Sequence, residues 1–220
     1  MEKAFWIDLS RPVVPGMPVF PDDPEVKETV IRTVENDGYR LTVLETAMHA
    51  GTHLDAPRHF LKEGNDVTQI PLDKFAGRAS VIRVLPQNGI LPTAAIREAW
   101  SRLEAPAERL LLDAGWAPRW GTAEFFAGFP GFEPDFGRFL KENGIVLFGS
   151  DLPSVKYGAL DTSSAHRELL GNGVVIVENL VGLEKLPEAV FFAAFPLNLA
   201  GMDGSMVRAV ARIRENGSFR

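Results

Sequence analysis

Alternating hydrophobic and polar positions dominate the first part of the chain. Residues 26–34 and 40–47 alternate apolar or β-branched residues with polar ones, which is the two-residue period of half-buried strands. The Asn-Asp-Gly sequence at 36–38 is typical of a turn, so the two segments are predicted to pair as a hairpin. Two further strands are predicted at residues 5–9 and 79–85.

The later part of the chain alternates helical patterns with short apolar segments. Helices are predicted near 93–103, 136–143 and 163–170, and strands near 108–113, 145–148, 174–177, 189–195 and 206–213. A strand-rich beginning followed by alternating helices and strands favours the α/β class, with a mixed sheet and helices packed outside it. The sequence has no internal repeat or low-complexity linker, so residues 1–220 are predicted to form a single compact domain.

Two segments are predicted to be long loops. Residues 10–24 contain five prolines, a density that excludes a helix interior or a central strand. Residues 114–135 are rich in Gly, Pro, Trp and Phe. Loops of this length often form part of a binding site.

Composition narrows the possible functions. The 220 residues carry a net charge of −6, so the chain offers no strong field for nucleic acid, and a nucleic-acid partner is not expected. The absence of cysteine excludes disulfides, thiolate metal sites and cysteine nucleophiles. The N-terminus lacks the pattern of a signal peptide, and no apolar run reaches the roughly 18 residues of a membrane helix. We therefore expect a soluble cytoplasmic protein.

Candidate chemistry is concentrated in one short segment. Three of the four histidines in the chain, His49, His53 and His59, lie within eleven residues, with Asp55 between them. Imidazole and carboxylate are the usual ligands of zinc and related divalent ions when thiolates are absent. A single histidine at a strand–loop junction is more often a hydrogen-bonding residue, but a cluster with an interposed carboxylate favours a metal site. His53 and Asp55 would point to one side if this stretch is extended.

The cluster resembles a known signature. The sequence His-x-Gly-Thr-His-x-Asp-Ala-Pro-x-His at 49–59 is similar to that of the metal-dependent cyclase family, which includes bacterial kynurenine formamidases (arylformamidases). Residues 6–10 with 18–22, 149–155, 178–180 and 195–208 resemble further segments of that family. The resemblance implies a compact α/β domain with a barrel-like β core, assembled as a homo-oligomer, either a dimer or a tetramer.

The resemblance also implies roles for particular residues. The implied ligands of a two-metal site are His49, His53, Asp55, His166 and Glu178. His59 corresponds to the proton donor and acceptor of the family, and Phe20 to an aromatic residue that lines the substrate pocket. Independently, five ligands exceed what one catalytic zinc usually takes, and Glu178 on an apolar strand is costly unless it is paired or coordinated. Two divalent ions are therefore expected, zinc first and manganese as the alternative.

Three functions remain open from the sequence. The first is an arylformamidase that converts N-formyl-kynurenine to kynurenine and formate, using hydroxide generated on the metal and proton transfer by His59. The second is a hydrolase of the same family that acts on a cyclic amide or lactone, as isatin hydrolase does. Lys156 favours keeping this alternative, because the formamidases usually have Asp at that position. The third is a metal-binding protein without catalysis.

Overall fold

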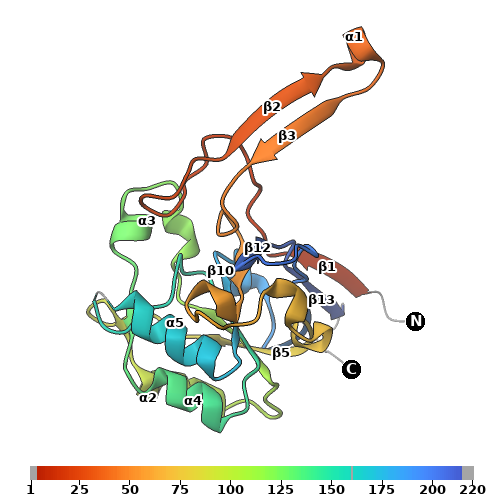
Figure 1. The fold of residues 1–220 in the computed structure, drawn as a ribbon. Coiled ribbons are helices and arrows are strands. Elements are labelled where there is room, and N and C mark those ends of the chain that lie inside the picture. The colour runs from red at the N-terminus through yellow and green to blue at the C-terminus, as the bar shows by residue number, and fades with distance from the viewer. Residues whose placement is uncertain (1–3, 160, 215–220) are drawn as a thin grey trace.

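A nine-stranded mixed sheet forms the centre of the computed structural model, which describes residues 4–159 and 161–214 (Figure 1). In spatial order the strands are β1 (Ala4–Asp8), β13 (Val210–Arg214), β11 (Ala189–Ala193), β5 (Ala76–Arg83), β7 (Arg109–Asp113), β9 (Leu147–Ser150), β10 (Val175–Glu178), β4 (His53–Asp55) and β12 (Gly204–Met206). β5, β7, β9 and β10 run parallel, and antiparallel strands flank them on both sides. The sheet curls into a half-barrel, which confirms the predicted α/β class and barrel-like core.

Three helices cover one face of this sheet. They are α2 (Thr93–Ser101), α4 (Phe136–Glu142) and α5 (Thr162–Gly171), each close to its predicted range (Figure 1). Shorter helical turns are α1 (Val34–Asp37), α3 (Glu124–Ala127), η1 (Pro57–His59), η2 (Val67–Gln69), η3 (Leu72–Lys74), η4 (Ala117–Arg119) and η5 (Leu183–Lys185). Across residues 4–159 and 161–214, no helix combines the length and apolar content needed to cross a membrane.

The apolar strands at the centre divide their side chains between two hydrophobic clusters. In β7, Leu110 and Leu112 pack into the cluster under the helices, whereas Leu111 packs into the cluster on the opposite face. Successive side chains of a strand point to opposite faces of a sheet, so a strand covered on both faces needs an unbroken apolar run. This is why the central strands lack the alternation seen near the N-terminus.

The predicted hairpin is present, but its predicted burial is wrong. β2 (Lys27–Arg32) and β3 (Leu41–Glu45) pair in antiparallel fashion, with α1 between them. Every residue of both strands is exposed. The hairpin projects away from the sheet (Figure 1), so no other part of the described chain covers the apolar positions that its alternating pattern predicts to be half-buried.

The long loop predicted at 114–135 is partly ordered. It contains η4 and α3, and it ends in β8 (Gly131–Phe132), which pairs with β6 (Ile90–Leu91) in a small parallel sheet. Its start is held by the buried carboxylate of Asp151, which accepts hydrogen bonds from the backbone amides of Ala114 and Ala117, each at 2.9 Å. The loop is therefore fixed against the carboxyl end of β9 and forms one wall of the pocket described below.

Candidate metal centre and active site

The short strand β4 positions the first two site residues. His53 and Asp55 are two residues apart on this strand, so their side chains point to the same face of the sheet. β10 pairs with β4 so that Glu178 lies directly opposite His53, and residues directly opposite in an antiparallel pair share a face. Two strands from distant parts of the chain thus bring an imidazole and two carboxylates together in a buried position.

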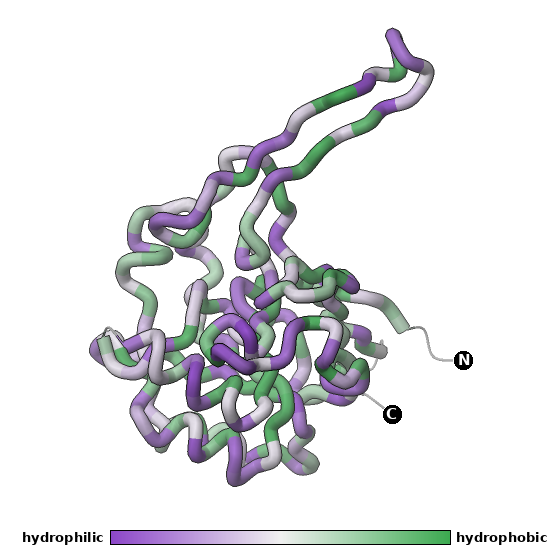
Figure 2. The backbone as a smooth tube through the Cα atoms, viewed as in Figure 1, coloured by the Kyte–Doolittle hydropathy of each residue, from purple (hydrophilic) through white to green (hydrophobic). Residues whose placement is uncertain are grey.

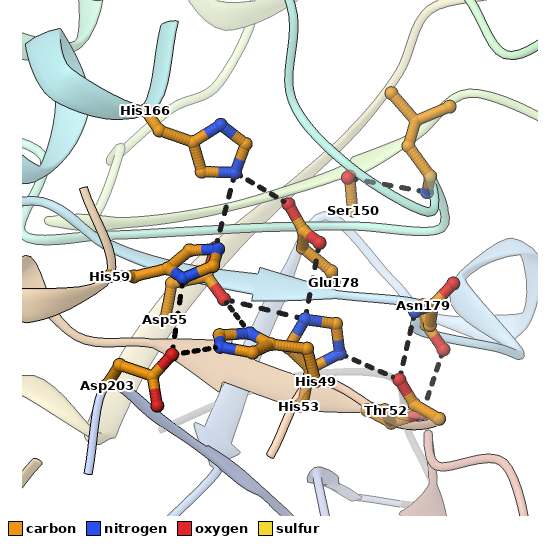
Figure 3. A network of polar contacts seen from close by, with 12 residues as sticks. His49, Thr52, His53, Asp55, His59, Ser150, His166, Glu178, Asn179 and Asp203 are labelled. Atoms are coloured by element: carbon orange, nitrogen blue, oxygen red, sulfur yellow. Dashed lines mark hydrogen bonds and ion pairs between the residues drawn. The ribbon is translucent and has the colours of Figure 1, made fainter. Parts of the chain in front are cut away.

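His166 completes this group from the helical layer. It lies on α5, and its Nε2 atom is 3.4 Å from Asp55 Oδ2 and 3.5 Å from Glu178 Oε1. His53 Nε2 is 3.5 Å from Asp55 Oδ1 and 3.3 Å from Glu178 Oε2. Each carboxylate therefore presents one oxygen to each histidine, as Figure 3 shows.

A third imidazole, that of His49, approaches from the turn before β4. His49 Nδ1 lies 2.9 Å from Asp55 Oδ1, and its side chain is only 15% exposed. Asp55 thus contacts three imidazoles through its two oxygens. The structure brings together all five predicted ligands, although they come from four separate elements and turns (Figure 3).

The remaining nitrogen of each of these histidines faces an oxygen acceptor. His53 Nδ1 donates to the carbonyl of Gly51 at 2.9 Å, and His166 Nδ1 donates to the carbonyl of Thr162 at 2.8 Å. His49 Nε2 lies 3.0 Å from Asp203 Oδ2. Because a carbonyl oxygen can only accept, His53 and His166 each carry a proton on Nδ1, so Nε2 is the nitrogen that faces the carboxylates and would bind a metal ion. Metal-binding histidines are typically fixed in this way.

Two buried oxygens support the fit of a cation to this group. Asp55 Oδ2 and Glu178 Oε1 are fully enclosed and accept no hydrogen bond from the described residues. A buried carboxylate oxygen without a hydrogen bond is costly, and a divalent ion between the carboxylates and the imidazoles would lower that cost. Hard oxygen and imidazole nitrogen donors together suit zinc and manganese.

The charges of these side chains also favour a bound cation. Burial alone would lower the pKa of His53 and His166, but the carboxylates of Asp55 and Glu178 outweigh it and raise each pKa to about 10. Burial would raise the pKa of Asp55, but hydrogen bonds from the surrounding histidines hold it well below its ordinary value. The two carboxylates therefore favour positive charge on the imidazoles that face them, which is the place that a divalent ion would take.

His59 occupies a different position from the five predicted ligands. It lies on η1, immediately after β4, and its ring stacks on the ring of His49 with centroids 3.9 Å apart. His59 Nδ1 is 3.4 Å from Asp203 Oδ2, and its side chain is 28% exposed. Asp203 therefore contacts both the predicted ligand His49 and the more exposed His59, as Figure 3 shows.

A glycine permits this close arrangement. Gly204 begins β12 directly beside His49, and a Cβ atom at that position would lie 2.6 Å from the His49 ring and 2.8 Å from the carbonyl of Leu54. Neither neighbour is the flexible end of a long side chain. Any side chain at 204 would displace His49 or separate β12 from β4.

A pocket of about 210 Å3 opens over the histidines. Its apolar wall consists of aromatic side chains: Phe20, Phe60, Trp120 and Phe126. Phe20 and Phe126 meet edge to face with ring centroids 5.8 Å apart, which joins the proline-rich loop to the loop at 114–135. Phe20 lines this pocket, and its contact with substrate stays a prediction.

One polar residue of the site escaped sequence analysis. Asp203 stands in an Asp-Gly-Ser sequence that reads as a simple turn between strands, yet it contacts two of the site histidines. It is 154 residues from His49 in the sequence, and only the pairing of β12 with β4 brings it into place. No local pattern could have identified it.

The chain is similar to known proteins over most of its length. The family described as "Putative cyclase" matches residues 7–157. The "Kynurenine formamidase" of Salinibacter ruber is 35% identical to this chain over 212 residues, which span 94% of this chain and 96% of that protein.

Two solved structures share the fold. Isatin hydrolase A from Labrenzia aggregata, bound to benzyl benzoate, superposes with a TM-score of 0.84 and 25% identity, covering 96% of this chain and 94% of that one. A structure described as a potential metal-dependent hydrolase with cyclase activity has a TM-score of 0.78 and 25% identity, covering 96% and 98%. With a family match over residues 7–157 and a formamidase relative aligned along nearly its whole length, the chain belongs to the cyclase family.

Proposed function

We propose that this chain, a hydrolase of the cyclase family, is an arylformamidase that converts N-formyl-kynurenine to kynurenine and formate. The observation that carries the proposal is a cluster of imidazoles and carboxylates at the floor of an aromatic pocket, with His59 beside it. The 35% sequence identity to a kynurenine formamidase over nearly the whole chain supports the same substrate. Pockets for drug-sized ligands are about 300–1,000 Å3, so the pocket of about 210 Å3 suits a small aromatic amide.

In this proposal His49, His53, Asp55, His166 and Glu178 hold two divalent ions. When bound, such ions polarise a carbonyl oxygen and lower the pKa of a coordinated water toward about 7. Zinc is the first expectation and manganese the second. The buried floor of the pocket keeps bulk water away from the ligands, since His53, Asp55, His166 and Glu178 are each at most 3% exposed.

His59 moves the proton in this reaction. It faces the pocket beside the ligands, and its Nδ1 lies near Asp203, which leaves Nε2 free for substrate. The oxygen of water adds to the formyl carbon while His59 takes the water proton. The bond between the formyl carbon and the aryl nitrogen then breaks, and His59 returns the proton to that nitrogen, giving the amine and formate.

Asp203 is the residue that positions His59. Its carboxylate lies within 3.4 Å of His59 and 3.0 Å of His49, so it fixes the orientation of the proton-transfer group relative to a ligand. Asp203→Asn is expected to lower kcat by about 10–100-fold, the usual effect of losing an outer partner of a metal site, with a smaller change in KM.

The control for this variant is Asp135→Asn, an aspartate that begins α4 away from the pocket and pairs only loosely with Arg138 at 4.0 Å. Steady-state kinetics of both variants, with metal content measured on the same samples, separates positioning from metal loss. Wild-type kcat in Asp203→Asn would show that Asp203 does not orient His59.

A cyclic aryl amide is the second candidate substrate. It is favoured by the superposition on isatin hydrolase A. Lys156, the position that departs from the formamidase pattern, is buried outside the pocket wall: its Nζ donates to the carbonyl of Ala159 at 2.9 Å and lies 4.0 Å from the centre of the Phe129 ring. The residue therefore does not contact substrate in this pocket and gives no reason to prefer the cyclic amide.

Separate kinetic assays on each compound distinguish the two candidate substrates. Protein stripped with a chelator and reloaded with Zn2+ or Mn2+ is assayed on N-formyl-L-kynurenine and on isatin, with the stripped protein as control. We expect kcat/KM of about 10,000 M⁻¹ s⁻¹ or more on the formamide, an ordinary enzyme efficiency, and a value at least tenfold lower on isatin. A preference for isatin would contradict the arylformamidase assignment and leave the metal centre unaffected.

A further inference from the structure

Arg11 is a charged side chain next to the aromatic wall of the pocket, and the proposed reaction does not use it. It belongs to the proline-rich loop at 10–24 and is half-buried, but it is not among the residues that line the pocket. Its Nε atom is fully enclosed and has no hydrogen-bond acceptor among residues 4–159 and 161–214. Burying a charged donor without an acceptor is costly, so other groups around the guanidinium must offset this cost.

Two aromatic rings of the loop at 114–135 surround the guanidinium. The Arg11 Cζ atom lies 4.2 Å from the centre of the Trp120 ring and 5.3 Å from that of Phe125. Arg11 Nη2 also donates a hydrogen bond to the carbonyl of Ala117 at 3.1 Å. A cation over the face of a tryptophan is attracted by the ring, and the attraction is strongest where water is excluded. Because Trp120 lines the pocket and Arg11 does not, the guanidinium supports the aromatic wall from behind.

The guanidinium keeps its charge in this setting. Burial lowers the pKa of Arg11 to about 10, and the negative charge of the Asp151 carboxylate opposes that decrease. The side chain is therefore protonated at neutral pH and interacts with Trp120 as a cation. Asp151 accepts hydrogen bonds from backbone amides at the start of the same loop. Two groups of opposite charge thus hold the loop in place.

The backbone of Arg11 contacts the part of the chain that carries the predicted metal ligands. Its amide donates to Thr52 Oγ1 at 2.9 Å, and that hydroxyl donates to the carbonyl of Asn179 at 2.8 Å. Thr52 directly precedes His53, and Asn179 directly follows Glu178. Arg11 therefore connects the floor of the pocket, through its backbone, to the aromatic wall, through its side chain.

We propose that Arg11 is a positioning residue that holds Trp120 at a fixed place relative to the metal centre and thereby places the aryl group of the substrate. The inference rests on the proposed function, because that function assigns an aromatic amide to the pocket. A ring that is ordered before the substrate arrives costs no ordering free energy on binding. Loss of Arg11 should therefore raise KM more than it lowers kcat.

The test compares variants of the purified, metal-loaded, full-length protein. Arg11→Met removes both the charge and the planar group, whereas Arg11→Lys keeps the charge alone and replaces Arg11→Met if that variant does not fold. Trp120→Leu and the double variant complete a double-mutant cycle. The matched control is Arg119→Met, because Arg119 lies 4.1 Å from the centre of the Trp116 ring in the same loop, and neither residue lines the pocket. Circular dichroism and metal content check each variant.

Steady-state kinetics on N-formyl-L-kynurenine give the first result. Arg11→Met is expected to raise KM about tenfold, the equivalent of a desolvated cation–ring pair, and to change kcat by less than about threefold. Arg11→Lys should raise KM less, because an ammonium group keeps the charge but lacks the planar face that stacks on a ring. In the Trp120→Leu background the Arg11 substitution should have no further effect, and Arg119→Met should leave KM unchanged. A wild-type KM in the Arg11 variants, or an equal effect with and without Trp120, would overturn the proposal.

Quenching of tryptophan fluorescence by acrylamide gives a second result that does not depend on the reaction. The part of the emission that Trp120→Phe removes is assigned to Trp120. Its quenching is expected to increase in the Arg11 variants and to stay at the wild-type level in Arg119→Met. A wild-type protein that hydrolyses no arylformamide would contradict the proposed function, whereas unchanged quenching of Trp120 in the Arg11 variants would overturn the role of Arg11 whichever substrate the pocket binds.

Discussion

Asp55→Asn is expected to lower kcat/KM on an arylformamide by at least about 1,000-fold. Asp55 is fully buried and is the one carboxylate that contacts three of the described imidazoles, His49, His53 and His166. Asparagine keeps the size of the side chain but removes the negative charge and replaces one acceptor oxygen by a donor. Metal ions supply several kcal/mol of transition-state stabilisation, and about 4 kcal/mol corresponds to a 1,000-fold change in rate.

The same variant is expected to lose bound metal. Elemental analysis of the purified protein, measured beside the kinetics, should show a clear fall in metal content relative to wild type. Asp8→Asn is a suitable control, because Asp8 forms an exposed ion pair with Arg208 at the far edge of the sheet. An Asp55→Asn protein that keeps both its metal and its activity would exclude a bridging role.

His59→Ala is expected to give the opposite combination, with metal retained and turnover reduced by about 100- to 10,000-fold, the usual contribution of general acid–base catalysis. His59 is more exposed than the five proposed ligands and packs on His49 through its ring face. Its nearest charged partner is Asp203, not one of the buried carboxylates. Removing the imidazole therefore removes a proton carrier and leaves the ligands in place.

His49, Asp55 and His59 also lie close enough together to hold an ion, and in that case His59 would be a ligand. Comparison with His53→Ala distinguishes this role from proton transfer. Metal content and kcat are measured for both variants under the same loading conditions. His53→Ala should lose metal and turnover, and His59→Ala only turnover. Equal loss of metal in the two variants would make His59 a ligand.

Much of the fold could be predicted from periodicity because local pattern and tertiary environment agree. The central strands were predictable as short β-branched or leucine-rich runs, since both of their faces are covered. The helices α2, α4 and α5 also lie near their predicted ranges. The short strands β4 and β12 were not predicted, because three residues are too few to show a period.

The hairpin shows where pattern reasoning fails. The alternation at 26–34 and 40–47 correctly predicts paired strands, but it cannot say what covers their apolar side chains. The prediction of half-burial assumes a covering surface within the same chain. Among residues 4–159 and 161–214 the structure places no such surface over the hairpin, so its apolar side chains are exposed (Figure 2).

The residues that the structure brings together at the candidate site could be predicted from the sequence, but not all of the groups around them. The spacing of His49, His53 and Asp55 and the unusual Glu178 on an apolar strand carry their signal locally. Asp203 carries none, because its role depends on β12 pairing beside β4. The assignment of roles to these residues remains a prediction that the variants above test.

The most direct test of the metal centre is titration of chelator-stripped protein with Zn2+ or Mn2+, with bound metal and turnover of N-formyl-L-kynurenine measured on the same samples. The account predicts no turnover without metal, and turnover that rises with bound metal to a plateau at two ions per chain. Full turnover by the stripped protein, or a folded protein that binds neither ion, would contradict it.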